Sequence, residues 1–294
     1  MQDLPSYDQL LAQARTKAAI VRESAEPHAP RPDLRWRNTA IIAGGAAVIG
    51  GYGYRTWWRE GFTGQFRRQR EGWFGPDTQF SGIDKLGHVF TGYLAVRGMT
   101  PLFEWVGNSR EDSLRLATWT TWGTMTAMEV LDGFSRDYRF SHEDFIANTV
   151  GVALGWLMET NPALDALVDV RFSYRASPLS NWDPPGDYAG QRFHVAIKAD
   201  GVPALRDVPI VKYLELNMAY GAPGVDTPDE WRLHDFALRR REVFLGVSLN
   251  LSRLLADAAY GGRRSSTRVQ RAADFAFEHF QFPALYKRGR DLDR

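Results

Sequence analysis

The sequence predicts an α+β protein with an N-terminal membrane-anchor helix, a small helical bundle and a C-terminal antiparallel β-rich region with a terminal helix. Three observations predict this arrangement. An uncharged stretch rich in Gly, Ala and Ile follows a polar start. Three segments with helical periodicity come next. After Pro162, apolar and polar residues alternate, as they do in half-buried strands.

Residues 1–37 form a polar tail, in which residues 7–23 have a helical pattern. Residues 38–58 are the predicted anchor, because Trp36 and Trp57 flank an uncharged run as aromatic residues flank membrane spans. A spanning helix needs about 20 residues, and this run reaches that length only when its flanking residues are counted. We favour an anchor over the alternative, a buried Gly-rich core helix.

Residues 59–162 are the predicted helical domain. Helical periodicity covers residues 84–106, 111–131 and 142–159. Pro101 predicts a kink or break in the first helix, because proline lacks the N–H that continues the ladder. Gly133 and the Asn161-Pro162 pair mark the ends of the other two.

Residues 163–294 are the predicted β-rich extension. Alternating patterns in residues 171–176, 192–199, 212–219 and 242–249 indicate a small antiparallel sheet. Residues 265–281 then predict a helix, and a stripe of phenylalanines there suits docking onto the sheet.

Composition excludes several classes of function. The 294-residue chain has a formal net charge of +1 and no cysteine. A dedicated nucleic-acid-binding protein usually has a strong basic excess, so we expect no nucleic-acid partner. Without cysteine the chain has no disulfides, no thiolate metal site and no cysteine nucleophile.

Polar residues interrupt the faces of the three helical segments that should be apolar. Burying such groups without partners costs a few kcal/mol each, so their helical spacing predicts one shared cluster. In chain order its polar members are Asp84, Lys85, His88, Tyr93, Glu129, Asp132, Ser141, Asp144 and Asn148.

Asp84 and His88 are four residues apart and share a helix face. Asp84 either orients His88 or pairs with Lys85. His88 is a candidate metal ligand, general base or donor to an anionic head group. A structural histidine with satisfied hydrogen bonds is an equally good interpretation.

Glu129 and Asp132 face together near the end of a helix, where negative charge is disfavoured. They therefore invite a counter-cation, which is either a hard divalent ion or a basic residue, namely Lys85, Arg136 or Arg139. Paired carboxylates also divide acid and base roles in catalysis. Two solvated carboxylates are the alternative.

Ser141 and Asp144 match a helix capping box, so Asp144 is either a cap partner or a site residue. Asn148, Gly151 and Gly155 follow on the same helix face. Small residues there predict a tightly packed neighbour, which we expect to be the helix that begins near Asp84. That packing would bring His88 near Asn148 and Asp144.

We predict a binding cluster of His88, Glu129, Asp132, Asp144 and Asn148, of which His88, Glu129 and Asp132 are the candidate metal ligands. Asp84, Lys85, Tyr93, Arg139 and Ser141 are expected to support it. The sequence identifies no cofactor, and a divalent cation is the candidate. No catalytic residue is assigned, because the sequence lacks a G-x-S-x-G elbow, a P-loop and an H-E-x-x-H motif. A hydrolase would have to use metal-bound water beside His88.

Four short sequence motifs resemble those of a bacterial family of uncharacterised envelope proteins, the YfiM-like predicted periplasmic lipoproteins. They are Glu71-Gly72-Trp73-Phe74-Gly75, Asp84-Lys85-Leu86-Gly87-His88, Asp132-Gly133-Phe134-Ser135 and Asp187-Tyr188-Ala189-Gly190-Gln191. The shorter skeleton of Asp84, Lys85, His88, Tyr93, Glu129, Arg139, Ser141, Asp144 and Asn148 is also similar to VanZ-like membrane proteins. Lipoprotein members carry a lipidated cysteine that this chain lacks, so an uncleaved anchor would replace it. The resemblance implies no established activity.

We therefore expect an uncharacterised membrane-anchored protein of the bacterial cell envelope, with its main domain in the periplasm. Its polar cluster would bind a cation or an anionic head group. The alternative is a non-catalytic structural or accessory subunit of a membrane assembly, in which the polar row is an interhelical hydrogen-bond network. Membrane lipid and other membrane protein subunits are the expected partners.

Overall fold

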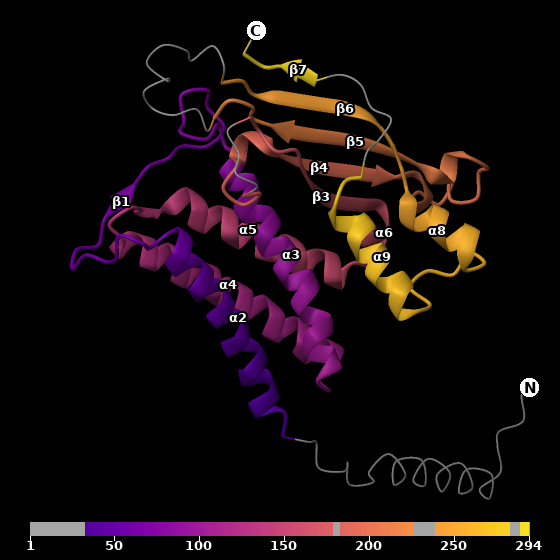
Figure 1. The fold of residues 1–294 in the computed structure, drawn as a ribbon. Coiled ribbons are helices and arrows are strands. Elements are labelled where there is room, and N and C mark those ends of the chain that lie inside the picture. The colour runs from indigo at the N-terminus through magenta and orange to yellow at the C-terminus, as the bar shows by residue number, and fades with distance from the viewer. Residues whose placement is uncertain (1–32, 179–182, 226–238, 283–288, 294) are drawn as a thin grey trace, which may run out of the picture.

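A computed structural model describes residues 33–178, 183–225, 239–282 and 289–293 (Figure 1). The helices are α2 (Arg35–Thr56), α3 (Ile83–Trp105), α4 (Arg110–Phe134), α5 (His142–Thr160), α6 (Pro162–Leu167), α8 (Leu251–Ala259) and α9 (Arg268–His279). The strands are β1 (Arg68–Gln69), β2 (Phe140–Ser141), β3 (Val168–Tyr174), β4 (Gln191–Lys198), β5 (Leu214–Gly221), β6 (Glu242–Leu249) and β7 (Gly289–Asp291). The predicted helix in residues 7–23 lies outside the described residues.

The α+β class is confirmed, with a helical bundle followed by an antiparallel sheet of strand order β3-β4-β5-β6-β7. Helices α3, α4 and α5 pack on one another, and α3 also touches β3 and β4. The main core therefore joins both parts, since Ile83, Phe90 and Tyr93 of α3 pack with Phe193 of β4 and Met158 of α5.

The predicted anchor forms a helix, α2, but a membrane span is not supported. Within the residues that the structure describes, none of the helices combines the length and the hydrophobicity that a membrane crossing requires. The uncharged run is short of about 20 residues and consists largely of Gly and Ala, which contribute little hydrophobicity. Instead, α2 lies beside α4 (Figure 1). Asn38 and Asn108 exchange hydrogen bonds at one end, and Trp58 bonds Asp132 at the other.

Of the kink or break predicted at Pro101, the break is wrong, because α3 continues through Pro101 to Trp105. Proline removes one ladder hydrogen bond, but tertiary packing holds the last turn. Phe103, two residues later, is fully buried.

The close approach of α3 and α5 is confirmed and depends on glycine. A Cβ added at Gly151 would lie 2.2 Å from the Val89 carbonyl oxygen, and one at Gly155 would lie 2.8 Å from Val96 Cβ. Gly92 on α3 faces the same contact, 3.0 Å from the Val152 nitrogen. The first turns of the two helices are thereby brought within side-chain reach.

Over much of the sheet, the buried face is polar and the exposed face is aliphatic. One face buries polar and charged side chains on adjacent strands: Asp169, Arg171, His194, Lys198, Glu215, Asn217 and Ser248. Arg171 pairs with Asp169 and Glu215, and Lys198 pairs with Asp169. The opposite face exposes aliphatic side chains beyond the part that packs on α3: Val195, Ile197, Leu216, Met218, Leu245, Val247 and Leu249.

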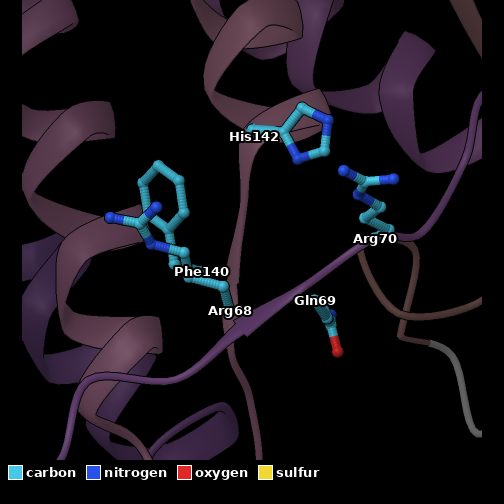
Figure 2. Close-up of a pocket in the computed structure, with 5 residues that line it drawn as sticks. All are labelled: Arg68, Gln69, Arg70, Phe140 and His142. Carbon is cyan, nitrogen blue, oxygen red and sulfur yellow. The ribbon is translucent and has the colours of Figure 1, made fainter.

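Strands β1 and β2 form a separate parallel pair, in which Arg68 lies opposite Phe140 and Gln69 opposite Ser141. This ribbon ties the segment before α3 to the residues that begin α5 (Figure 2). It therefore positions residues 69–71 beside the polar ends of the bundle.

We predict that Gly151→Ala lowers the free energy of unfolding by about 1–3 kcal/mol, because overpacking outweighs alanine's better helix propensity. Gly123→Ala on α4 is the matched control. It faces open space, so it should stabilise by about 0.5–1 kcal/mol. Urea unfolding measures both, and equal effects of the two substitutions would contradict the tight crossing.

Candidate functional site

The polar cluster lies where the first turns of α3 and α5 meet the last turns of α4. Helix α3 supplies Asp84, Lys85 and His88, whereas α5 supplies Asp144 and Asn148. The segment after β1 adds Glu71, which sequence reasoning did not place in the site. The glycine contacts of α3 and α5 set the distance between these groups.

Lys85 is the centre of the buried part. Its side chain is 2% exposed, and its Nζ lies 2.7 Å from Asp84 Oδ2 and 2.6 Å from Asp144 Oδ1. Glu71 forms the third ion pair. Burial lowers the pKa of the ammonium, but the three carboxylates outweigh burial and raise the pKa above its ordinary value.

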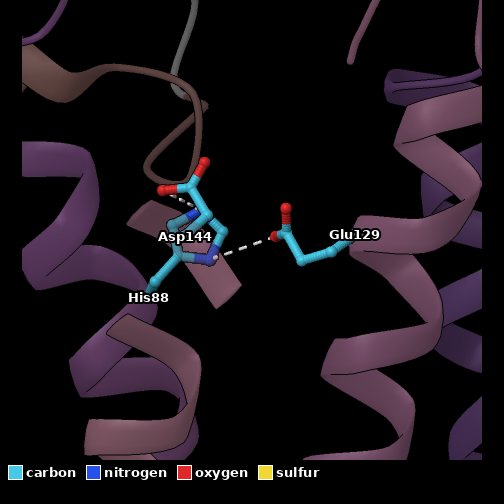
Figure 3. Close-up of side chains that lie close together, drawn as sticks. All are labelled: His88, Glu129 and Asp144. Carbon is cyan, nitrogen blue, oxygen red and sulfur yellow. Dashed lines mark ion pairs between the residues drawn. The ribbon is translucent and has the colours of Figure 1, made fainter. Parts of the chain in front are cut away.

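His88 lies between two carboxylates and is partly open to solvent, with 29% of its side chain exposed. Its Nδ1 is 2.9 Å from Asn148 Oδ1 and 3.8 Å from Glu129 Oε1. Its Nε2 is 3.6 Å from Asp144 Oδ1. Figure 3 shows the imidazole between Asp144 and Glu129. If Nδ1 donates to Asn148, the lone pair of Nε2 is left for a ligand.

Glu129 is buried and accepts a hydrogen bond from Asn148 Nδ2 at 3.3 Å. Burial, reinforced by the nearby charges of Asp144 and Asp132, raises its pKa to about 9. At neutral pH the side chain is therefore protonated. Burial also raises the pKa of Asp144 to about 6, although His88 and Lys85 oppose that shift.

Asp132 has a different environment from its expected partner Glu129. Its Oδ1 accepts a hydrogen bond from Trp58 Nε1 at 2.6 Å. Burial raises its pKa to about 6, and the bond from Trp58 acts against that rise. Its interaction with the indole ties the site to the segment after α2, a contact that the helical pattern did not predict.

The groups that could hold a metal ion contain Asp144 rather than Asp132. Among the described residues they are His88 with Glu129 and Asp144, and Glu71 with Asp84 and Asp144. In each group, potential ligand atoms lie within 4.8 Å of one another. Three helices contribute the first group, which mixes an imidazole nitrogen with carboxylate oxygens.

Three residues that were predicted to support the binding cluster have other positions or other roles. Tyr93 is buried in the core, where its ring stacks on His279 at 5.3 Å. Arg139 is exposed on the loop after α4. The Ser141 hydroxyl caps α5 by accepting a hydrogen bond from the Asp144 N–H at 3.2 Å. Asp144 therefore donates its backbone N–H to the Ser141 cap, and its carboxylate belongs to the cluster.

Sequence reasoning also missed Glu143, which is buried and accepts a hydrogen bond from the Gly72 N–H at 3.2 Å. Neither Glu71 nor Glu143 follows the helical pattern that identified the others. One signal for Glu71 existed. A buried lysine such as Lys85 needs carboxylate partners. Glu71 is the acidic residue of the Glu71-Gly72-Trp73-Phe74-Gly75 motif that precedes α3.

We predict that Glu129 makes the protein less stable as pH rises. Its folded pKa of about 9 is above the ordinary 4.5, so the folded state keeps a proton that the unfolded chain loses. The stabilising contribution is fully present below pH 4.5 and is lost as pH rises through 9. Glu129→Gln should therefore gain stability relative to the wild type between pH 5 and 9.

Urea unfolding at several pH values, with chelator present, measures this difference. Glu111→Gln on the exposed face of the same helix is the control, and its stability should follow the wild type at every pH. Parallel curves for Glu129→Gln and the wild type would show that Glu129 titrates normally.

Residues 70–160, about a third of the chain, match a family described as predicted periplasmic lipoprotein (DUF2279). The match contains each cluster member from Glu71 to Asn148, but not Trp58 or the sheet. No curated protein and no solved structure matches. The family description supports the coarser part of the expected resemblance, an uncharacterised family of periplasmic or envelope lipoproteins. It also confirms the predicted localisation, a membrane-anchored protein of the bacterial cell envelope with its main domain in the periplasm.

Proposed function

We propose that the helical domain binds a divalent cation at His88, Glu129 and Asp144, with Asn148 orienting the imidazole. The observation that carries this proposal is an excess of acid in a buried space. Five carboxyl groups surround one ammonium and one imidazole: Glu71, Asp84, Glu129, Asp132 and Asp144. A bound cation would allow Glu129 to ionise.

The donor set limits the kind of cation. One imidazole nitrogen with carboxylate oxygens suits Zn²⁺ or Mn²⁺ better than Ca²⁺, which prefers a shell made of oxygen. The exposed edge of His88 gives an ion access to otherwise buried ligands. An anionic head group, the other ligand expected here, is disfavoured because it would add negative charge to an acidic interior.

A cation at this position would also lower the pKa of bound water. Hydrolysis is therefore the activity to assay once binding is measured. The hydroxyls of Ser135 and Ser141 accept backbone hydrogen bonds, and we assign them a structural role.

A structural or accessory role in the membrane is the second candidate, and the exposed apolar sheet face favours it. Contiguous apolar surface of this kind marks interaction sites. The exposed side chains on β4, β5 and β6 are aliphatic, whereas protein interfaces are enriched in aromatic residues and arginine. Lipid acyl chains are therefore the partner that this face fits better than another protein subunit.

We predict that Zn²⁺ or Mn²⁺ stabilises the wild type by about 2.7 kcal/mol at a concentration 100-fold above Kd. His88→Ala and Glu129→Gln should each abolish that stabilisation, because each removes a ligand. Thermal unfolding with chelator and then with each cation measures it.

Glu111→Gln, an exposed carboxylate on the helix that holds Glu129, should keep the full metal response. A metal response that survives in both site variants would overturn the proposal. No response in the wild type, together with a less stable His88→Ala protein, would favour the interhelical network instead.

For the sheet face, we predict that the pair Met218→Glu and Leu245→Lys lowers flotation with phospholipid vesicles. These two positions are directly opposite on β5 and β6, so the new charges pair across the strands and preserve the sheet. Val269→Glu changes an exposed residue of α9 and should float like the wild type. Equal flotation of all three proteins would exclude the sheet face as a lipid contact.

A further inference from the structure

The β1–β2 ribbon separates side chains onto two faces, as alternation in strands requires. Gln69 and Glu71 turn toward the buried cluster, where the Gln69 amide donates to Glu71 and Glu71 pairs with Lys85. Arg68 and Arg70 point the other way (Figure 2). The same alternation places the side chains of Phe140 and His142 on the face of the ribbon that carries Arg68 and Arg70 (Figure 2).

These residues line a cavity of about 500 Å³. Its lining residues are Arg68, Gln69, Arg70, Phe140 and His142. Arg68 comes from β1 and Arg70 from the residue after it, whereas Phe140 comes from β2 and His142 from the start of α5. The cavity therefore depends on the pairing of Arg68 with Phe140.

Arg68 and Arg70 form no ion pair with any other residue in the described ranges. The Arg68 guanidinium lies 5.7 Å from the centre of the Phe66 ring, a cation–π contact that leaves its N–H groups free to donate. This contrasts with Lys85, whose positive charge is matched by three carboxylates. The cavity thus holds two solvent-exposed guanidinium groups that pair with none of the carboxylates in the described residues.

Glu143 is the acid that contacts His142, and its Oε2 lies 3.1 Å from His142 Nδ1. Its carboxylate already accepts from the Gly72 N–H and from the Ser141 hydroxyl at 3.4 Å. Glu143 therefore accepts from the Nδ1–H of His142 and holds the imidazole in place. The Nε2 of that tautomer is an acceptor for a phosphate oxygen that carries a proton. The net charge of the lining remains positive.

We propose that this cavity binds a phosphate group through Arg68, Arg70 and His142. Guanidinium groups match phosphate oxygens with two parallel N–H donors each. The Phe140 ring adds an apolar wall, and the volume exceeds that of a phosphate ion, so the ligand is an organic phosphate. Its source is either a phospholipid head group or a soluble phosphate ester, which share this chemistry.

This site is independent of the proposed cation site. Arg68 and Arg70 face the cavity and Glu71 faces the cluster, whereas Gln69 lines the cavity and donates to Glu71. The two sites therefore share no proposed ligand residue. Loss of metal binding in Glu129→Gln should leave phosphate binding unchanged, so failure of one proposal is distinguishable from failure of the other.

The test is isothermal titration of the full chain with glycerol 3-phosphate and with inorganic phosphate at about 150 mM salt, where weak surface attraction is screened. Each arginine that bonds phosphate contributes about tenfold in affinity. Arg68→Gln with Arg70→Gln should weaken binding of glycerol 3-phosphate by about 100-fold. Arg115→Gln, whose side chain pairs with Glu111 on the exposed face of α4, should bind like the wild type.

Flotation with vesicles that contain phosphatidylglycerol distinguishes the sources. Binding of the ester and of the vesicles, both lost in the double variant, supports a lipid head group. Binding of the ester alone supports a soluble phosphate ester. No binding by the wild type, or equal binding by the double variant and the wild type, overturns the proposal. If the double variant does not fold, Arg70→Gln alone gives the same test with a tenfold loss.

Discussion

The ion pairs of Lys85 are the interaction on which the arrangement of the helical domain depends. A buried ammonium is tolerated only when its charge is matched and its N–H groups are bonded. Here Asp84 matches it from α3, Asp144 from α5 and Glu71 from the segment after β1. The interaction therefore ties together three pieces of chain, and removing Lys85 would leave three carboxylates without their shared counter-charge.

The sheet follows the same rule on a larger scale. Its buried face places Arg171 and Lys198 among Asp169 and Glu215, while its aliphatic face is largely exposed. Arg97 extends this polar interior to the bundle, because it pairs with Glu159 of α5 and Asp165 of α6. Charge is therefore paired inside the protein, and aliphatic surface lies outside.

Much of the fold was predictable from the sequence, because periodicity reports local structure directly. Helices α3, α4 and α5 and strand β6 lie within a few residues of the expected ranges, and the glycines of α5 predicted the contact between His88 and Asn148. Alternation could not show which sheet face is buried, since both faces are regular. Glu71 and Trp58 escaped prediction because they reach the site from irregular segments, where no periodic pattern indicates direction.

The proposed metal site consists of His88, Glu129 and Asp144. Anomalous diffraction from crystals soaked in Zn²⁺ or Mn²⁺ tests it most directly, since it locates the ion without depending on stability. We expect a peak about 2.0–2.2 Å from the His88 nitrogen and from oxygens of Glu129 and Asp144. A peak elsewhere, or none while His88 keeps its bond to Asn148, would contradict the proposed site and leave the polar cluster as a structural network.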